Sequence, residues 1–127
     1  MVKNKITSSL GSLEKEIMEI IWKAKTASVR FVLNKLSKKR AIAYTTIMTT
    51  MSRLHAKGIL KRYQDASGAY IYTPTEDKQS FLARVSGNMI NSLLNNYGDM
   101  AVAQFIDILE NSHYNTAEWR RKLKKIK

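Results

Sequence analysis

The 127-residue sequence contains no cysteine, which excludes disulfides, thiolate metal sites and cysteine nucleophiles. It also lacks any apolar run approaching the roughly 18 residues that a membrane span requires. The first seven residues are partly basic, but no apolar stretch follows them, so a secretory signal is not expected. These absences predict a cytoplasmic protein with no membrane partner.

Features typical of enzymes and metalloproteins are missing as well. The sequence has no phosphate-binding glycine loop, no zinc-ligand spacing and no recognisable pair of nucleophile and base. The two histidines, His55 and His113, are isolated from any cluster of acids or histidines. We therefore predict that the protein is not an enzyme and that it uses neither a metal nor a cofactor.

Acidic residues are scarce, and their distribution divides the chain. Ten Asp and Glu residues stand against 22 Lys and Arg residues, which gives a formal net charge of +12. Residues 1–74 carry 14 basic and 4 acidic groups, residues 75–115 carry 2 and 5, and residues 116–127 carry 6 and 1. A strongly basic segment favours a polyanionic partner. We therefore predict two domains, 1–74 for contact with the polyanion and 75–127 for a different contact.

Hydrophobic periodicity predicts three short helices in the first domain, at about 12–24, 28–38 and 43–58. Serine residues stand where the first two would begin, so Ser12 and Ser28 are expected to cap them.

The third of these helices has two contrasting faces. Ile47, Met51 and Leu54 recur at helical spacing and predict a buried face. The opposite face carries short side chains and one arginine but no acid: Thr45, Thr49, Ser52 and Ala56, flanked by Thr46 and Arg53. Gly58 fits the left-handed residue that ends a helix.

The period then changes from helical to alternating. Two segments rich in aromatic and β-branched residues, 59–63 and 69–73, flank the turn-forming residues 64–68. This pattern predicts a β-hairpin that ends at Pro74, the only proline of the chain.

Helical periodicity returns in the second domain. Thr75 is expected to cap a helix that reaches about residue 96, and a shorter helical segment follows around residues 102–109. A last helix is expected to start with Thr116 as its cap and to run to residue 126.

Three short helices followed by a hairpin, in a basic segment, have the order of a winged helix-turn-helix domain. The predicted fold class is therefore mainly α with a small β-hairpin wing, followed by a helical dimerisation domain. A helix about 10–12 Å wide fits the major groove of DNA, where hydroxyls and arginine can contact base edges and phosphates. Two other functions stay open: a sequence-nonspecific architectural DNA-binding protein and a winged-helix module for protein interaction.

Three segments also carry a family resemblance: Gly11–Trp22, Ala43–Gly58 and Tyr70–Pro74. They contain Leu-Glu-x-Glu-x-Met, Tyr-Thr-Thr-x-Met-Thr, Arg-Leu-x-x-Lys-Gly and Tyr-Thr-Pro in this order. The chain resembles the BlaI/MecI/CopY family of penicillinase repressors over nearly its whole length, most specifically over residues 10–74. The resemblance implies a winged-helix transcriptional repressor that binds a palindromic operator in double-stranded DNA as a homodimer.

The resemblance also implies positions for the DNA contacts. The part of the third helix that faces the groove would comprise Ala43, Tyr44, Thr45, Thr46 and Thr49. Basic side chains around it would contact phosphates: Arg53 further along the helix, Lys61 and Arg62 on the wing, and Lys38, Lys39 and Arg40 beside the preceding turn.

Apolar faces beyond Pro74 are broader than one small domain can cover, so we predict that a second copy covers them. The candidate dimerisation residues are Phe81, Leu82, Val85, Met89, Leu93 and Phe105. The alternative is that these helices fold back on their own domain. In the basic tail, Trp119, Leu123 and Ile126 could form a membrane-surface segment, but we expect them to pack on their own domain.

The signal that would release the repressor is not apparent. Antibiotic-responsive members of the family are cut at an Asn-Phe bond, and here the corresponding pair is Gln104-Phe105. Copper-responsive members carry a Cys-x-Cys pattern that this chain lacks. An inactivating protease or an unknown inducer is therefore the expected further partner.

Overall fold

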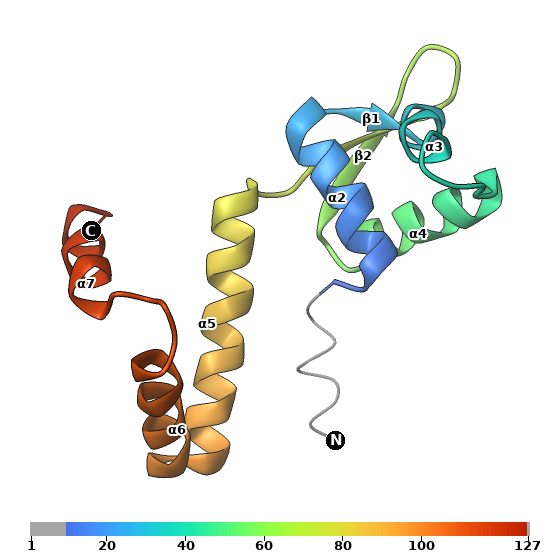
Figure 1. Ribbon diagram of the computed structural model, residues 1–127. Coiled ribbons are helices and arrows are strands. Elements are labelled where there is room, and N and C mark those ends of the chain that lie inside the picture. Colours follow the sequence, from blue (N-terminus) through green and yellow to red (C-terminus); the bar gives the residue numbers. More distant parts are fainter. Residues whose placement is uncertain (1–9, 127) are drawn as a thin grey trace. The chain divides into compact units, whose positions relative to one another are not determined.

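The computed structural model describes residues 10–126, with side chains up to Lys125, and it comprises two compact units (Figure 1). The first unit ends at Ser86 and the second begins at Gly87. The elements are, in order, α2 (Ser12–Ala24), β1 (Ala27–Ser28), α3 (Val29–Ser37), α4 (Tyr44–Ala56), β2 (Leu60–Gln64), β3 (Tyr70–Pro74), α5 (Lys78–Tyr97), α6 (Asp99–Glu110) and α7 (Thr116–Ile126). Among the described residues, no helix is long and apolar enough to span a bilayer.

A mainly helical chain with one small antiparallel sheet confirms the predicted fold class. The division between the two units falls within α5, whereas the domains predicted from charge meet at residue 74. The functional division at residue 74 stays a prediction.

The helix starts in the first unit follow local hydrogen bonds. Ser28 caps α3 as predicted, because its hydroxyl oxygen accepts a hydrogen bond from the Phe31 amide (3.1 Å). The prediction for α2 was wrong by one residue: Ser12 is the first helical residue and Gly11 is the cap. The Gly11 amide donates to Glu14 Oε1 (3.0 Å), which satisfies this amide without a capping side chain.

Helix α4 ends where the sequence predicts. Gly58 has φ +81°, which lies in the left-handed region that glycine adopts without strain. Its amide donates to the His55 carbonyl oxygen, and the Ile59 amide donates to the Leu54 carbonyl oxygen (both 3.0 Å). This pair of bonds is a Schellman motif, and it brings the chain from α4 almost directly into β2.

The sheet has three antiparallel strands in the order β1-β3-β2. β2 and β3 form the predicted hairpin, with Leu60 opposite Pro74. β1 was not predicted, because two residues show no detectable alternation. It pairs Ala27 with Tyr72 and so attaches the start of α3 to the hairpin.

The core of the first unit lies between α2, α3, α4 and the sheet. Each of these elements contributes fully buried side chains, which are Ile17, Met18, Ile21, Val32, Leu36, Ile47, Met51, Leu54, Leu60 and Tyr72. The predicted buried face of α4 is thereby confirmed. Burying one such apolar side chain contributes roughly 1.5–3 kcal/mol, so this cluster is the main source of the unit's stability.

Asp77, and not the predicted Thr75, caps α5. Asp77 Oδ1 accepts a hydrogen bond from the Ser80 amide (2.8 Å), and the hydrogen bonds from the Ser80 amide and hydroxyl lower the pKa of Asp77. The Thr75 hydroxyl instead donates to the Gly58 carbonyl oxygen (2.7 Å). Thr75 therefore ties the end of the hairpin to the end of α4.

The first turns of α5 pack against α2 within the first unit. Trp22 Nε1 donates to the Glu76 carbonyl oxygen (3.1 Å), and the Trp22 and Phe81 ring centroids lie 5.3 Å apart. Phe81 and Val85 are both buried there. These two residues of the predicted dimerisation set are therefore covered by their own chain.

The second unit contains helices whose apolar side chains are largely exposed. None of the residues of α6 is buried. In α7, Asn115 and not the predicted Thr116 is the cap, since Asn115 Oδ1 accepts from the Glu118 amide (3.1 Å). Trp119 and Leu123 are about half exposed, so the expectation that they pack on their own domain was wrong for these two residues of the single chain. The side chain of Ile126 lies outside the described residues.

Candidate nucleic-acid interface

The outer face of α4 is lined by short hydroxyl side chains. Thr45, Thr46 and Thr49 are all exposed, as the helical period predicts. Thr50 differs from them, because it is buried and its hydroxyl donates to the Thr46 carbonyl oxygen (2.8 Å). The hydroxyls of Thr45, Thr46 and Thr49 are therefore free to meet a ligand, whereas the hydroxyl of Thr50 is satisfied by the backbone.

The start of α4 is open. Ala43 occupies the cap position and provides no side-chain hydrogen bond, which leaves main-chain amides of the first turn available to an acceptor such as phosphate. Tyr44 is exposed, and the Arg30 guanidinium lies 5.6 Å from its ring centroid. No sequence pattern points to Arg30, because this contact depends on how α3 and α4 cross.

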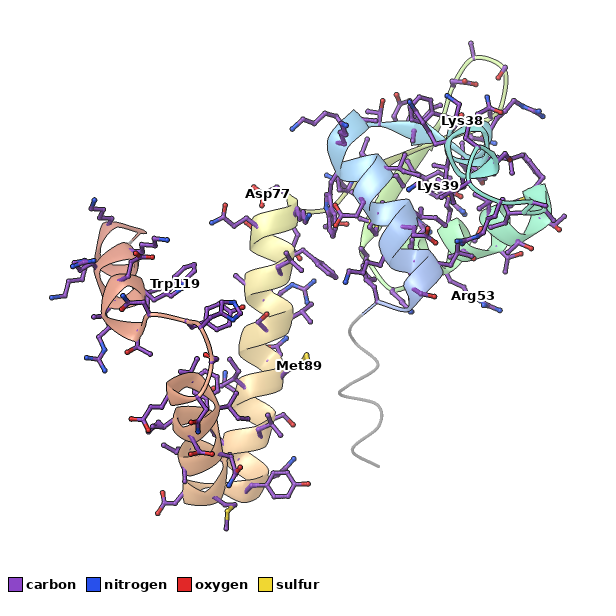
Figure 2. The ribbon with its side chains drawn as sticks, in the orientation of Figure 1. Lys38, Lys39, Arg53, Asp77, Met89 and Trp119 are labelled. Atoms are coloured by element: carbon purple, nitrogen blue, oxygen red, sulfur yellow. The ribbon has the colours of Figure 1, made fainter. Side chains whose placement is uncertain are left out.

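The basic turn between α3 and α4 contains residues of two kinds. Lys38 and Lys39 are exposed, and Figure 2 labels both at the end of α3. Arg40 is also exposed, but it forms a bidentate ion pair with Glu16 of α2 (2.7 and 3.3 Å). Arg40 therefore links the turn to α2, and the two lysines are the cations of this turn that are better placed to meet a phosphate.

Arg53 is exposed in the last turn of α4 (Figure 2). Near this end, Lys57 Nζ forms an ion pair with Glu14 Oε2 of α2 (2.8 Å). Partial burial alone raises the pKa of Glu14, but hydrogen bonds from Lys57 and the Gly11 amide outweigh it and hold that pKa below its usual value. Glu14 therefore forms its ion pair with Lys57, and the nearby positive charge of Arg53 also helps to lower the pKa of Glu14.

The two predicted basic residues of the wing face opposite ways, because neighbouring residues of a strand alternate between faces. Arg62 lies opposite Tyr72 on the core side, donates to the Tyr72 hydroxyl (3.3 Å) and stacks on Tyr70 with its guanidinium carbon 4.0 Å from the ring centroid. Lys61 shares the other, exposed side with Tyr63. Lys61 is therefore open to a ligand, whereas Arg62 is held by two tyrosines.

The tip of the wing is an ordered turn. Asp65 Oδ1 accepts hydrogen bonds from the Ser67 amide (2.9 Å), the Ser67 hydroxyl (2.6 Å) and the Ala69 amide (3.1 Å), and Gly68 has φ +88°. The hydrogen bond from the Ser67 hydroxyl is the largest cause of a lowered pKa at Asp65, and the amide bonds add to it. The acid is thus engaged in the turn and fixes the shape of the tip.

Side chains of the first unit therefore form a surface of hydroxyls and cations. Glu14, Glu16 and Glu19 of α2 each pair with a basic residue of the chain. None of these pairs involves Lys38, Lys39, Arg53 or Lys61. Chemically, such a surface can bind phosphates through the cations and base edges through the hydroxyls.

A sequence profile described as Penicillinase repressor matches residues 10–125, which is almost the whole chain. The chain belongs to the penicillinase repressor family. This finding confirms the resemblance inferred from sequence motifs, and the family is one of transcriptional repressors rather than enzymes.

Other members of the penicillinase repressor family align over much of the chain. It is 28% identical to the penicillinase repressor of Bacillus licheniformis over 77% of this chain and 76% of that protein. It is 29% identical to the methicillin resistance regulatory protein MecI of Mammaliicoccus sciuri over 94% and 96%. The solution structure of the DNA-binding domain of the repressor BlaI is similar as well, with a TM-score of 0.50, 31% identity and coverage of 55% of this chain and 84% of that domain.

The predicted dimerisation residues of this penicillinase repressor family member fall into two groups. Phe81 and Val85 are buried against the first unit. The other four, Leu82, Met89, Leu93 and Phe105, are 46%, 37%, 52% and 52% exposed. Figure 2 labels Met89 on α5.

Proposed function

We propose that the chain represses transcription by binding a palindromic DNA operator as a homodimer. The observation that carries the proposal is the outer face of α4, where exposed hydroxyls of Thr45, Thr46 and Thr49 lie between exposed cations. A helix of this width enters the major groove, and its short side chains let the backbone approach the bases.

Each group has a distinct role in this proposal. The threonine hydroxyls bond base edges, and their methyl groups pack against thymine methyls. Lys38 and Lys39 before the helix, and Arg53 at its far end, bind the phosphates on either side of the groove. Lys61 binds a phosphate beside the wing. Arg62 supports the wing through Tyr70 and Tyr72 and adds to the local positive potential.

The exposed apolar residues of α6 support the proposed homodimer. Eight of the twelve residues of α6 are apolar, which is typical of a helix with a broad buried face, yet Met100, Phe105 and Ile108 are all more than half exposed in the single chain. Each 100 Å² of apolar surface removed from water contributes about 2.5 kcal/mol, so covering this helix with a second copy is strongly favourable. A twofold dimer would present two copies of α4, which is why the operator should be palindromic.

The alternative functions predict different patterns of affinity for DNA duplexes. An architectural protein would bind every duplex with similar affinity, and a protein-interaction module would bind none. Selection of bound duplexes from a random pool at two salt concentrations separates the three functions. A recovered palindrome, still preferred at the higher salt, is the expected result. Binding without an enriched sequence, or no binding, would overturn the operator proposal.

Release by proteolysis would require a local opening of α6. The Gln104–Phe105 bond lies in the interior of that helix, and a protease needs its substrate in an extended conformation. A partner that covers α6 would protect the bond further. We therefore propose that any cleavage here follows dissociation or opening of the second unit.

A further inference from the structure

A groove of about 560 Å³ lies between α2 and α3 on the first unit. Its floor is apolar and includes Ile20, Ala24, Phe31 and Leu36. Phe31 is a large apolar side chain that stays 38% exposed beside this groove. The volume falls within the range of about 300–1,000 Å³ that small-molecule sites occupy, and it is too small for a protein domain.

Three lysines surround the apolar floor: Lys23, Lys35 and Lys39. Two acids also line the groove, but each is engaged elsewhere. Glu16 pairs with Arg40 (2.7 Å) and Glu19 pairs with Lys78 (2.9 Å). Over residues 10–126, the ion pairs of the chain involve none of the three lysines. The charge that the groove offers to a ligand is therefore positive.

We propose that this groove binds a small amphiphilic carboxylate, either an aromatic or an aliphatic acid, and that the bound acid weakens DNA binding. The apolar body of the acid covers Phe31 and its neighbours, and the carboxylate pairs with Lys35 and Lys39. A neutral apolar molecule would match the floor but leave the lysines unpaired. A phosphate backbone would match the lysines but leave the floor in water.

The link to DNA runs through Lys39, and this step rests on the proposed function. Lys39 lines the groove and also belongs to the basic turn before α4. The amides of Lys39 and Arg40 both donate to the Leu36 carbonyl oxygen (3.0 and 3.2 Å), so the floor and the turn are one continuous structure. A carboxylate on Lys39 removes a cation from the phosphates and places a negative group close to them.

Binding to the groove can be tested without DNA. The full chain is titrated with 4-phenylbutyrate and, as the uncharged control, 4-phenylbutanamide, while amide chemical shifts are followed by NMR. Saturable shifts confined to α2, α3 and the turn are expected for the acid, with a dissociation constant of roughly 1 mM for a ligand of this size. The amide should bind several times more weakly because it cannot pair with the lysines.

Variants separate the charged rim from the apolar floor. Lys35→Gln should weaken binding of the acid about two- to fivefold, the range for one partly exposed ion pair. Phe31→Ala should weaken acid and amide alike, by about tenfold, because both lose the apolar contact. Lys61→Gln removes the same charge from the wing, outside the groove, and should leave binding of the acid unchanged. Equal binding of acid and amide, shifts centred on residues 90–105, or no saturable shift would overturn the proposal.

Release of DNA is measured separately, with a duplex recovered from the random pool. The acid should lower the affinity of the unsubstituted chain for this duplex. It should have about tenfold less effect on Phe31→Ala at the same concentration, because that variant loses the acid but keeps the DNA-contacting side chains. Acid binding without any change in DNA affinity would overturn the regulatory step alone. Failure of the chain to bind any duplex would overturn the proposed function and leave the groove measurement intact.

Discussion

The two units of the chain differ in how far they bury their apolar side chains. In the first, Ile17, Met18 and Ile21 of α2 are fully buried against α3, α4 and the sheet. In the second, no residue of α6 is buried, and Met100 and Ile108 are 65% and 62% exposed. Both regions are rich in apolar residues and both form helices, but only the first closes a core within one chain.

In the proposed function, this difference corresponds to two different partners: DNA for the first unit and a second copy of the chain for the second. A closed core makes folding of the first unit a property of the single chain. In the proposed dimer, the exposed apolar side chains of α6 would make the second unit depend on association, so its stability should rise with protein concentration. Recognition of DNA and assembly of the dimer are then separable, because the side chains proposed for each lie in different units. The following substitutions test that separation.

The largest effect is expected from a charge in the exposed apolar surface of the second unit. Phe105→Glu would bury a carboxylate twice in a twofold dimer, at a cost of about 4 kcal/mol or more, which corresponds to roughly a thousandfold weaker association. Sedimentation equilibrium of the full chain measures this directly. In a Trp119→Phe background, Trp22 fluorescence should report an unchanged fold in the first unit.

A matched substitution controls for charge alone. Gln104→Glu introduces the same carboxylate one residue earlier, in place of an exposed polar side chain, and should leave association within about tenfold of the original. An unsubstituted chain that is monomeric at micromolar concentration would contradict the dimer. So would a Phe105→Glu chain that associates as strongly as the Gln104→Glu chain.

The next largest effect is expected from replacing a buried isoleucine of the first unit, compared with an exposed isoleucine of the second. Ile21 is fully buried, so Ile21→Ala should lower the free energy of unfolding of the first unit by about 3 kcal/mol. Ile108→Ala should leave that free energy unchanged and weaken association instead. Urea unfolding in a Trp119→Phe background follows the first unit alone, because Trp22 is then the only tryptophan. Equal losses from both substitutions would mean that the units unfold as one.

A smaller effect should separate recognition of the DNA sequence from formation of the dimer. Replacing Thr46 and Thr49 together with Ala should cost about 2 kcal/mol on the selected duplex and little on random duplexes. Association should not change, because neither side chain lies in the second unit. Equal losses on selected and random DNA for the threonine variant would contradict the assignment of α4 to the groove.

Lys61→Ala should weaken binding to all duplexes. It should also reduce the slope of log affinity against log salt concentration by about 0.9.

Sequence periodicity predicts the helices well in both units, because the spacing of apolar residues does not depend on what covers them. It fails where the outcome depends on distant contacts. Phe81 and Val85 continue the same apolar stripe as Met89 and Leu93, yet Trp22 of α2 covers the start of that stripe and nothing in the described chain buries the rest. The cap of α5 is also not fixed by residue type, since Asp77 and Thr75 both belong to the types that cap helices, and the hydrogen bond to the Ser80 amide decides for Asp77.

The candidate site shows the same limit. The exposed hydroxyl face of α4 follows from helical spacing alone, and the structure confirms its exposure. The contacts that each arginine makes do not follow from helical spacing, because they depend on the tertiary structure. Arg40 is tied to Glu16, Arg62 is stacked on Tyr70, and Arg30 lies beside Tyr44 without any signal in the sequence. Residue type therefore predicts the kind of ligand, and packing decides which cations can reach it.

The smallest effect concerns the surface of the first unit, where Glu14 of α2 and Lys57 after α4 form an ion pair. Because the pKa of Glu14 is lowered in the folded chain, its contribution is present at neutral pH and is lost as the pH falls through that lowered value. A double-mutant cycle with Glu14→Gln and Lys57→Gln should give a coupling of about 0.5–1 kcal/mol at pH 7, and the coupling should vanish once Glu14 is protonated. Urea unfolding followed by Trp22 fluorescence in the Trp119→Phe background measures this coupling, and high salt should reduce it. A coupling that persists at acidic pH would mean that the two side chains contribute through packing. Glu14 and Lys57 would then stabilise the first unit through the apolar parts of their side chains and not through their charges.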